Sequence, residues 1–345
     1  MFERGTDARD NGYFFYKFLK EKHPEIKLYY IIDKKSADFH KVKEDAVAFG
    51  SFKNYWVLAH AEKIVSTHCY FGAPYINKKI FDFCRLYKNF YYLQHGVMMN
   101  SIPIYYYKAI PLKLFVCGAK PEYEYIRDVF GYPETVVKYT GLARYDGLHD
   151  ASAKRQILVM PTWRDYIRTR DDFIKSSYFK NWQAILKDER MMKILEEQDL
   201  KLIFYPHYEV QKYIDCFEHS SKNVTNALFA EHDVQALLKE SMLLVTDYSS
   251  VFFDFAYMGK PIVYFQFDRD EFYSKHYEQG YFSFPEMGFG HVCENADGVI
   301  ENVKKCIDNS FEPEEIFKER VNNFFVLKDK NNCQRIYNAI MEISE

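Results

Sequence analysis

Short apolar runs alternate along the chain with segments whose apolar residues follow helical spacing. Asp10–Glu21 shows this spacing, with Asp10 or Asn11 as a possible N-cap, and so does Pro121–Phe130. The apolar runs have the length of buried parallel strands. In the first half of the chain they are Leu28–Ile32, Lys63–Thr67, Phe90–Gln94, Leu114–Gly118 and Val136–Gly141. This alternation predicts a doubly wound parallel sheet.

The same pattern restarts after a polar stretch at residues 149–155. The strand candidates of the second half are Gln156–Met160, Leu200–Tyr205, Met242–Thr246 and Ile262–Phe267, and the helix candidates are Tyr178–Gln198, Asp233–Glu240 and Val251–Met258. Asp297–Ser344 is helical in pattern throughout. We therefore expect two Rossmann-like α/β domains, residues 1–150 and 151–345, the second ending in closing helices.

The beginning of the chain departs from this scheme. A Rossmann-like half normally opens with a central strand that leads into its first helix. Here Met1 and Phe2 resemble the end of a strand, and Glu3–Arg9 resembles the loop after it. We expect the first strand of residues 1–150 to be missing or a stub, through truncation or an upstream start.

Composition narrows the class of protein. The chain has 345 residues, of which 48% are hydrophobic, enough for a sizeable core. Lys and Arg total 46 against 49 Asp and Glu, which argues against a dedicated nucleic-acid binder. The seven cysteines form no C-x-x-C pair, so free thiols are expected. Aromatic residues make up 19%, which predicts that some lie on surfaces that touch sugars, bases or a membrane interface.

Two histidines directly follow predicted strands. Gln94–Gly96 ends one run of the first half, and Tyr205–His207 ends one of the second. Ligands of such sheets bind at the carboxyl ends of the strands. An imidazole there can take a proton from a hydroxyl or, when protonated, stabilise charge on a leaving diphosphate. We expect His95 and His207 to face one cleft; the alternative is that each only caps a strand end or turn.

Two further strand ends carry hydroxyl and charged groups. After Met160 come Thr162 and Arg164, which suit phosphate oxygens, although an ordinary surface arginine fits the pattern too. A helix starting at Ser249 or Ser250 would offer hydroxyls and backbone N–H groups to an anion, although simple N-capping has the same local sequence. The occurrence of all four segments at successive strand ends favours the functional interpretation.

Other sequence patterns exclude common chemistries. The chain lacks G-x-x-x-x-G-K-[ST], G-x-G-x-x-G and H-E-x-x-H, so P-loop, simple dinucleotide and zincin interpretations have no support. Asp268-Arg269-Asp270 matches the D-x-D pattern that holds a divalent metal in some transferases. A solvated loop is the preferred interpretation of so short an acidic string.

Taken together, these segments resemble the CDP-glycerol glycerophosphotransferase family, which contains teichoic-acid primases and polymerases and related capsule enzymes. The resemblance runs from about Asp10 to the end of the chain. It rests on Gln94–Gly96, Gly141–Asp146, Pro161–Arg164, Tyr205–His207, Thr246–Phe255, Gly259–Ile262, Gly280–Phe282 and Gly288–Gly290. The ordered set is specific, whereas each motif alone is weak.

The resemblance implies a GT-B fold, with two Rossmann-like domains facing a cleft. It implies transfer of a polyol phosphate, glycerol phosphate first, from a CDP-activated donor to an acceptor hydroxyl, with release of CMP and without a cofactor or metal. The implied partners are the CDP-polyol, a lipid-linked or polysaccharide acceptor and the inner face of a bacterial membrane, to which a cytoplasmic enzyme attaches peripherally. Nucleic acid is not among them.

The resemblance also assigns roles. His95 becomes the base that deprotonates the acceptor hydroxyl, while His207 and Arg164 hold the donor diphosphate with help from Thr162. The other donor-side candidates are Ser249 and Ser250, as hydroxyl and amide donors, and Asp247 and Asp254, for polyol, ribose or structural contacts.

Two rival functions fit the same residues. A GT-B glycosyltransferase, or a sugar-nucleotide epimerase of the same fold, would also use two histidines and an anion site at a helix start. A non-catalytic binding module is disfavoured, because it need not retain His95, His207 and Arg164. CMP release marks phosphopolyol transfer, whereas UDP release marks glycosyl transfer.

Overall fold

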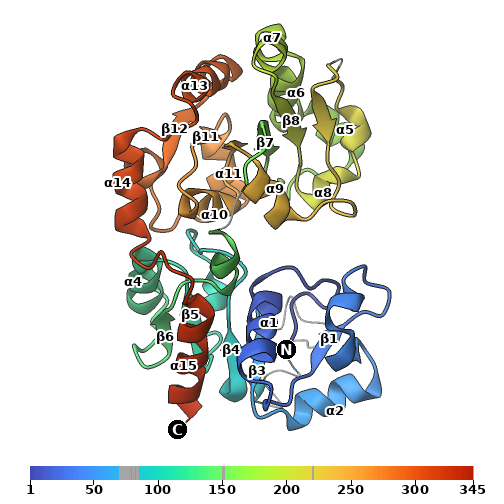
Figure 1. The fold of residues 1–345 in the computed structure, drawn as a ribbon, viewed down its shortest axis with the longest axis vertical. Helices are drawn as coiled ribbons and strands as arrows, with labels where there is room; N and C mark the ends of the chain where they lie inside the picture. The colour runs from blue at the N-terminus through green and yellow to red at the C-terminus, as the bar shows by residue number, and fades with distance from the viewer. Residues whose placement is uncertain (70–78, 80–81, 83–84, 150–151, 220, 345) are drawn as a thin grey trace. The chain divides into compact units, whose positions relative to one another are not determined.

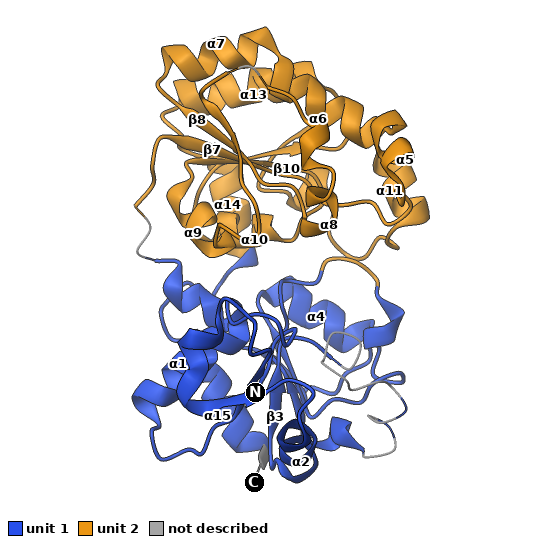
Figure 2. Cartoon of the chain, turned by 90° about the vertical axis from the view of Figure 1, so that its right-hand side faces the viewer, with its two compact units in different colours: residues 1–98, 102–149, 324–345 blue, residues 99–101, 150–323 orange. Residues whose placement is uncertain are grey.

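The computed structural model describes residues 1–345 except 70–78, 80–81, 83–84, 150–151, 220 and 345. The chain divides into two compact units, which Figure 2 shows in different colours. Unit 1 contains residues 1–98, 102–149 and 324–345, and unit 2 contains residues 99–101 and 150–323. Each unit has a parallel sheet of its own, which confirms the predicted α/β fold class.

Unit 1 is built on a four-stranded parallel sheet (Figure 1). Its order is β3 (Ile64–Ser66), β4 (Phe90–Tyr92), β5 (Leu114–Cys117) and β6 (Val137–Tyr139). Every residue of the first three strands is buried, which explains why their sequences are nearly continuous apolar runs. A second, two-stranded parallel sheet pairs β1 (Tyr30–Ile32) with β2 (Ala46–Ala48).

The first two residues lie between these two sheets. Phe2 forms an isolated parallel bridge with Ser66 of β3, and its N–H donates to Val65 O at 3.2 Å. On the other side, Ile31 N of β1 donates to Met1 O at 2.9 Å. A single bridge residue therefore occupies the position between β1 and β3.

The described helices of unit 1 cover these strands. They are α1 (Asn11–Lys22), α2 (Phe52–His60), α4 (Lys120–Asp128) and α15 (Asn332–Ser344), with the 3₁₀ segments η1 (Phe39–Asp45), η2 (Leu86–Asn89), η3 (Pro103–Tyr105) and η4 (Ala143–Gly147). The position of helix α15 differs from the expected domain division, which placed the end of the chain in the second domain. Residues 324–345, which include α15, belong to unit 1. The helix packs on α1 and η4 of unit 1, because both carboxylate oxygens of Asp146 accept backbone N–H groups, from Asn332 and Cys333 at 2.9 Å each.

Unit 2 contains a six-stranded parallel sheet. Its order is β12 (Gly290–Cys293), β11 (Ile262–Phe265), β10 (Leu243–Thr246), β7 (Gln156–Met160), β8 (Lys201–Phe204) and β9 (Val224–Asn226). The four central strands are those predicted from apolar runs. The two edge strands were not predicted, because each has only three or four residues and mixes exposed or half-buried positions with buried ones.

Helices surround the sheet of unit 2. They are α5 (Arg170–Lys175), α6 (Ser177–Lys187), α7 (Glu189–Glu197), α8 (Tyr208–Gln211), α9 (Val234–Glu240), α10 (Val251–Tyr257), α11 (Arg269–Lys275), α12 (Phe284–Met287), α13 (Ala296–Asp308) and α14 (Glu315–Phe324), with the 3₁₀ segment η5 (Ile214–Cys216). The single helix expected over Tyr178–Gln198 is divided in two at Asp188. The Asp188 carboxylate accepts Arg190 N at 2.8 Å and so starts α7 afresh.

Many aromatic side chains of the described residues fill the cores of the two units. In unit 2, the fully buried Trp182 packs edge-on against Phe265, with ring centroids 5.1 Å apart. Exposed aromatic side chains include three on α2, where Phe52, Tyr55 and Trp56 are 84%, 43% and 53% exposed, as well as Tyr208 and Tyr277 of unit 2; their contact with a sugar, base or membrane stays a prediction. The six described cysteines are free thiols; Cys84 lies outside the described residues. None of the described helices is long and apolar enough to cross a bilayer.

Candidate functional site

His95 lies at the carboxyl end of β4, in a loop of defined geometry. The preceding Gln94 has a left-handed backbone, with φ of 59°, which is unusual for a residue with a side chain. Its side-chain amide holds the loop in place by donating to Val116 O at 2.5 Å and to Glu122 Oε1 at 3.0 Å. The loop therefore presents His95, whose side chain is 51% exposed, on a fixed support.

Asp10, which the sequence pattern predicted only as a possible helix N-cap, is the carboxylate next to His95. Its Oδ2 lies 3.5 Å from Nδ1 of His95. Its Oδ1 accepts the N–H of Asn11 at the start of α1. A carboxylate at Nδ1 fixes the imidazole tautomer with the proton on that nitrogen and leaves Nε2 free to accept a proton.

Arg144, from the Gly141–Asp146 segment, ties Asp10 and His95 together. Its Nη1 donates to Asp10 Oδ1 at 2.6 Å and to the backbone oxygen of His95 at 2.5 Å. Burial alone would raise the pKa of Asp10, but the Arg144 guanidinium and the His95 imidazole outweigh it and lower that pKa below its usual range. Asp10 is thus an anion at neutral pH.

A second histidine stands beside this pair. The ring centroids of His68 and His95 are 5.1 Å apart, and His68 follows β3 just as His95 follows β4. Burial lowers the pKa of His68 to about 3, and the neighbouring His95 acts in the same direction to a smaller extent, so His68 stays neutral. His68 was not among the residues predicted from the sequence, although its position directly after a strand was the available signal.

Glu122, on the first turn of α4, is a completely buried carboxyl group under the same loop. Besides the Gln94 amide, it accepts Met98 N at 2.5 Å and Gly118 N at 2.6 Å. Burial raises its pKa to about 7, although these hydrogen bonds act in the opposite direction. Glu122 joins the loops that follow β4 and β5.

In unit 2, Thr162 follows β7 at the carboxyl edge of the sheet. Its backbone N–H donates to Asp247 Oδ1 at 2.8 Å. Its hydroxyl is buried and lacks a hydrogen-bond partner among the described residues. A buried hydroxyl without a partner is destabilising, so it is available to a ligand oxygen.

Arg164 does not have the geometry expected of a diphosphate ligand. The side chain is fully buried, and its Nε and Nη2 donate to both oxygens of Asp268 at 2.8 and 3.0 Å. Nη2 also donates to Asp247 Oδ2 at 2.9 Å, and Nη1 donates to the backbone oxygens of Thr162 and Trp163. All five N–H groups are thus used within the protein, and Arg164 ties together the segments after β7, β10 and β11.

The carboxylates around Arg164 follow from this arrangement. Asp268 is buried and binds Arg164 with both oxygens, which corrects its interpretation as part of a solvated loop. Asp247 is completely buried and also accepts the N–H of Tyr248 at 2.7 Å. Of the polyol, ribose and structural contacts expected of Asp247, these contacts fit the structural one. The described residues contain no group of three or more His, Cys, Asp or Glu side chains placed to hold a metal ion.

His207 caps helix α8 at the end of β8. Its Nδ1 accepts the N–H of Glu209 at 3.3 Å, which places the proton of the neutral imidazole on Nε2. The Trp163 indole stacks on the ring at 5.7 Å between centroids. His207 can therefore donate an N–H bond from Nε2.

The start of α10 carries the remaining candidates. Ser250 is the N-cap residue, and Ser249 precedes it; both are half-buried. Asp254, in the first turn, is buried and accepts Gln235 Nε2 at 3.0 Å. The candidates of unit 2 therefore follow neighbouring strands of one sheet, whereas His95 belongs to unit 1, and the expected shared cleft stays a prediction.

Comparison with known proteins agrees with these motifs. Residues 1–342 match the family described as CDP-Glycerol:Poly(glycerophosphate) glycerophosphotransferase. The minor teichoic acid biosynthesis protein GgaB of Bacillus subtilis (strain 168) is 33% identical over 360 residues, 99% of this chain and 39% of GgaB. The teichoic acid poly(glycerol phosphate) polymerase of the same strain is 23% identical over 366 residues, 95% of this chain and 46% of the polymerase. The chain thus spans less than half the length of these two relatives.

Solved structures share the fold at lower sequence identity. The wall teichoic acid polymerase TagF superposes with a TM-score of 0.72 at 18% identity, covering 99% of this chain and 88% of that one. MnaA of S. aureus, solved with UDP, gives a TM-score of 0.59 at 13% identity and covers 99% and 95%. The GT-B-like fold implied by the sequence resemblance is confirmed. By its match over nearly the whole sequence, the chain belongs to the CDP-glycerol:poly(glycerophosphate) glycerophosphotransferase family.

Proposed function

We propose that the chain transfers a polyol phosphate, with glycerol phosphate as the first candidate, from a CDP-activated donor to an acceptor hydroxyl of a teichoic acid or a related polymer. The observation that carries the proposal is the half-exposed His95, with Asp10 at its Nδ1. Family membership supplies the donor class. A variant of TagF has been solved after a soak with CDPG, which supports the same class of donor.

In the proposed reaction, His95 Nε2 takes the proton of the acceptor hydroxyl. The resulting oxygen nucleophile attacks the phosphorus of the polyol phosphate, and the bond from that phosphorus to the bridging oxygen of CMP breaks. Asp10 acts as a positioning residue, since its carboxylate contacts the imidazole of His95. Its negative charge also stabilises the imidazolium that forms.

On the donor side, three groups of unit 2 suit diphosphate oxygens. They are the buried hydroxyl of Thr162, the Nε2–H of His207 and the hydroxyls of Ser249 and Ser250. Arg164 acts indirectly, because it binds the backbone oxygen of Thr162 and the carboxylate that accepts the Thr162 N–H. These neutral donors replace a cation in the proposal, so we expect activity to persist in EDTA.

We also propose that the chain meets a lipid surface through α2. Phe52, Tyr55 and Trp56 lie on one face of this helix and are exposed, with Lys53 beside them. Aromatic rings prefer the interface between headgroups and acyl chains, and a lysine favours anionic lipids. This matches an acceptor that is lipid-linked.

The deciding experiment is incubation of the protein with CDP-glycerol, CDP-ribitol and common nucleotide sugars, each with a teichoic acid acceptor, followed by analysis of the released nucleotide. CMP release from a CDP-polyol, unchanged by EDTA, is the expected result. UDP release from a sugar nucleotide would instead support the rival function, glycosyl transfer. MnaA, which shares the fold, was solved with UDP, so the sugar nucleotides are part of the test. Loss of CMP release in EDTA and recovery with Mg²⁺ would contradict the metal-free scheme.

A further inference from the structure

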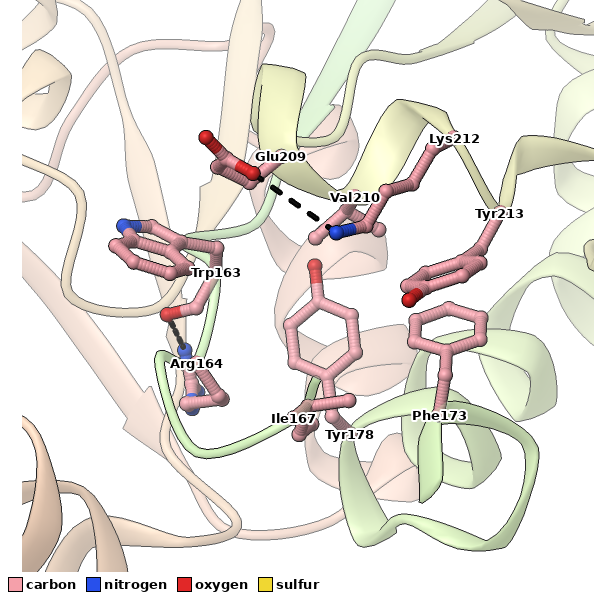
Figure 3. Close-up of a pocket in the computed structure, with 9 residues that line it drawn as sticks. All are labelled: Trp163, Arg164, Ile167, Phe173, Tyr178, Glu209, Val210, Lys212 and Tyr213. Atoms are coloured by element: carbon pink, nitrogen blue, oxygen red, sulfur yellow. Dashed lines mark hydrogen bonds and ion pairs between the residues drawn. The ribbon is translucent and has the colours of Figure 1, made fainter. Parts of the chain in front are cut away.

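A small pocket lies within unit 2, beside the stack of Trp163 on His207. Figure 3 shows the side chains that line it. They are Trp163, Arg164, Ile167, Phe173, Tyr178, Glu209, Val210, Lys212 and Tyr213. The space between these side chains is about 320 Å³, a figure that includes open solvent at the mouth of the pocket. Arg164 belongs to the site described above, and Trp163 and Glu209 contact His207 of that site; the remaining lining residues were not assigned to it.

One lining residue carries an unused hydrogen-bonding group. Tyr178, on α6, is 1% exposed, and its hydroxyl has no hydrogen-bond partner among the described residues. Figure 3 shows this hydroxyl pointing into the pocket, toward Val210 and the Lys212 side chain. Burial raises the pKa of Tyr178 well above its usual range, so the phenol stays protonated and can donate. An unpaired buried hydroxyl is destabilising, and a bound acceptor atom would remove that cost.

The charges around the pocket disfavour an anion. The Arg164 guanidinium is more than offset by its two buried carboxylate partners, Asp247 and Asp268. Lys212 is offset by Glu209, with Nζ and Oε2 4.0 Å apart. The sum of these five charges is negative, so a phosphate group gains no net attraction here.

The shape and walls of the pocket favour a neutral ligand with several hydroxyls. Flat rings line it, with Phe173 and Tyr213 stacked at 4.8 Å between centroids and Trp163 half-buried at another side. Such rings pack against C–H groups. The side chains of Glu209 and Lys212, 40% and 53% exposed, can accept from and donate to hydroxyls.

We propose that this Tyr178 pocket binds a neutral, hydroxyl-rich group, either a polyol or a sugar residue, with the Tyr178 hydroxyl as the buried donor. The inference deepens the proposed function, because the polymer acceptor or the transferred polyol would supply such a group. Binding itself does not require catalysis.

The test uses the full chain and saturation-transfer NMR titrations with glycerol, ribitol and N-acetylglucosamine, with inorganic phosphate as competitor. Tyr178→Phe removes only the unpartnered hydroxyl, so we expect an unchanged or higher Tm and affinity reduced on the order of tenfold, the loss of one hydrogen bond. Tyr132→Phe is the control, because that hydroxyl donates to Ile110 O in unit 1; it should leave binding unchanged. If glycerol or ribitol binds more tightly than N-acetylglucosamine, the bound group is a polyol; the opposite order indicates a sugar residue.

Three results would overturn the pocket: no neutral probe binds the wild-type protein, Tyr178→Phe binds the probes equally well, or phosphate displaces them. The proposed function fails separately. Probe binding that depends on Tyr178, without CMP release, would leave the pocket standing and remove the transfer reaction. If the protein releases CMP but Tyr178→Phe leaves probe binding and the acceptor KM unaltered, the transfer reaction stands and the pocket proposal is wrong.

Discussion

The carboxylate oxygen Oδ2 of Asp10 lies 3.5 Å from the imidazole Nδ1 of His95, and Arg144 holds both residues from the other side. The pair joins the start of α1 to the end of β4, two elements far apart in the sequence. This arrangement leaves Nε2 as the nitrogen that can act on a substrate.

His95→Ala should lower CMP release on the order of 10²–10⁴-fold, because the reaction loses its general base. Asp10→Asn should lower it on the order of ten- to a hundredfold and shift the ¹⁵N signals of His95 toward a mixture of tautomers. Asp45→Asn is the control, since Asp45 has a similar side-chain exposure of 19% against 21% and binds Lys20 instead. Wild-type turnover in His95→Ala would remove it from the role of base.

Thr162→Val should weaken donor binding without loss of Tm. Among the described residues the hydroxyl has no hydrogen-bond partner to lose, whereas a hydrogen bond to a charged phosphate oxygen contributes about 1.5–3 kcal/mol, roughly ten- to a hundredfold in Kd. Calorimetry with CDP-glycerol measures the effect. Equal affinity of the variant and the wild-type protein would show that the hydroxyl does not touch the donor.

Arg164→Met should lower the free energy of unfolding by about 3–5 kcal/mol, because it leaves Asp247 and Asp268 buried without their cation. The exposed pair of Arg170 and Asp215 provides the control, where Arg170→Met should change the free energy of unfolding far less, because solvent screens the pair. Denaturant unfolding measures both. A stable Arg164→Met protein that has lost only donor affinity would restore Arg164 as a direct ligand.

Glu122 should make unit 1 less stable as pH rises from about 4.5 to about 7. Its pKa is raised from 4.5 to about 7 by burial, so the folded state holds a proton that the unfolded state releases first. Protonation of Glu122 therefore contributes about 3 kcal/mol to the free energy of unfolding. This contribution is fully present below pH 4.5 and is lost above pH 7. The measurement is the free energy of unfolding of the wild-type protein and of Glu122→Gln as a function of pH. The difference between the two isolates the effect of Glu122, since the other groups titrate alike in both proteins. A difference that does not change with pH over this range would contradict the shift.

Phe52→Ser combined with Trp56→Ser should reduce sedimentation with vesicles that contain anionic lipid, because each substitution removes an exposed ring from α2. Val326→Ser is the matched control, because Val326 is 60% exposed elsewhere in unit 1. Equal binding of the double variant and the wild-type protein would exclude α2 as the lipid contact.

The sequence by itself determined the α/β class, the central strands of each unit and the residues that follow them. These properties are local: a buried parallel strand must be apolar along its length, and polar residues must follow where it leaves the core. His95, Thr162 and His207 could therefore be found from their positions directly after such runs. The same reasoning could not find β9 or β12, whose short, mixed sequences satisfy no strong period.

Only the tertiary structure decided what these residues contact. Arg164 and Asp268 are 104 positions apart and meet because β7, β10 and β11 are neighbours in the sheet, an order that no local pattern encodes. Asp10 reaches His95 only once α1 has docked beside β4, through Asn11 and the backbone oxygen of Gln94. A buried charge must be paired, and in the folded sheet Arg164 is paired with two carboxylates, whereas the buried hydroxyls of Thr162 and Tyr178 have no hydrogen-bond partner among the described residues.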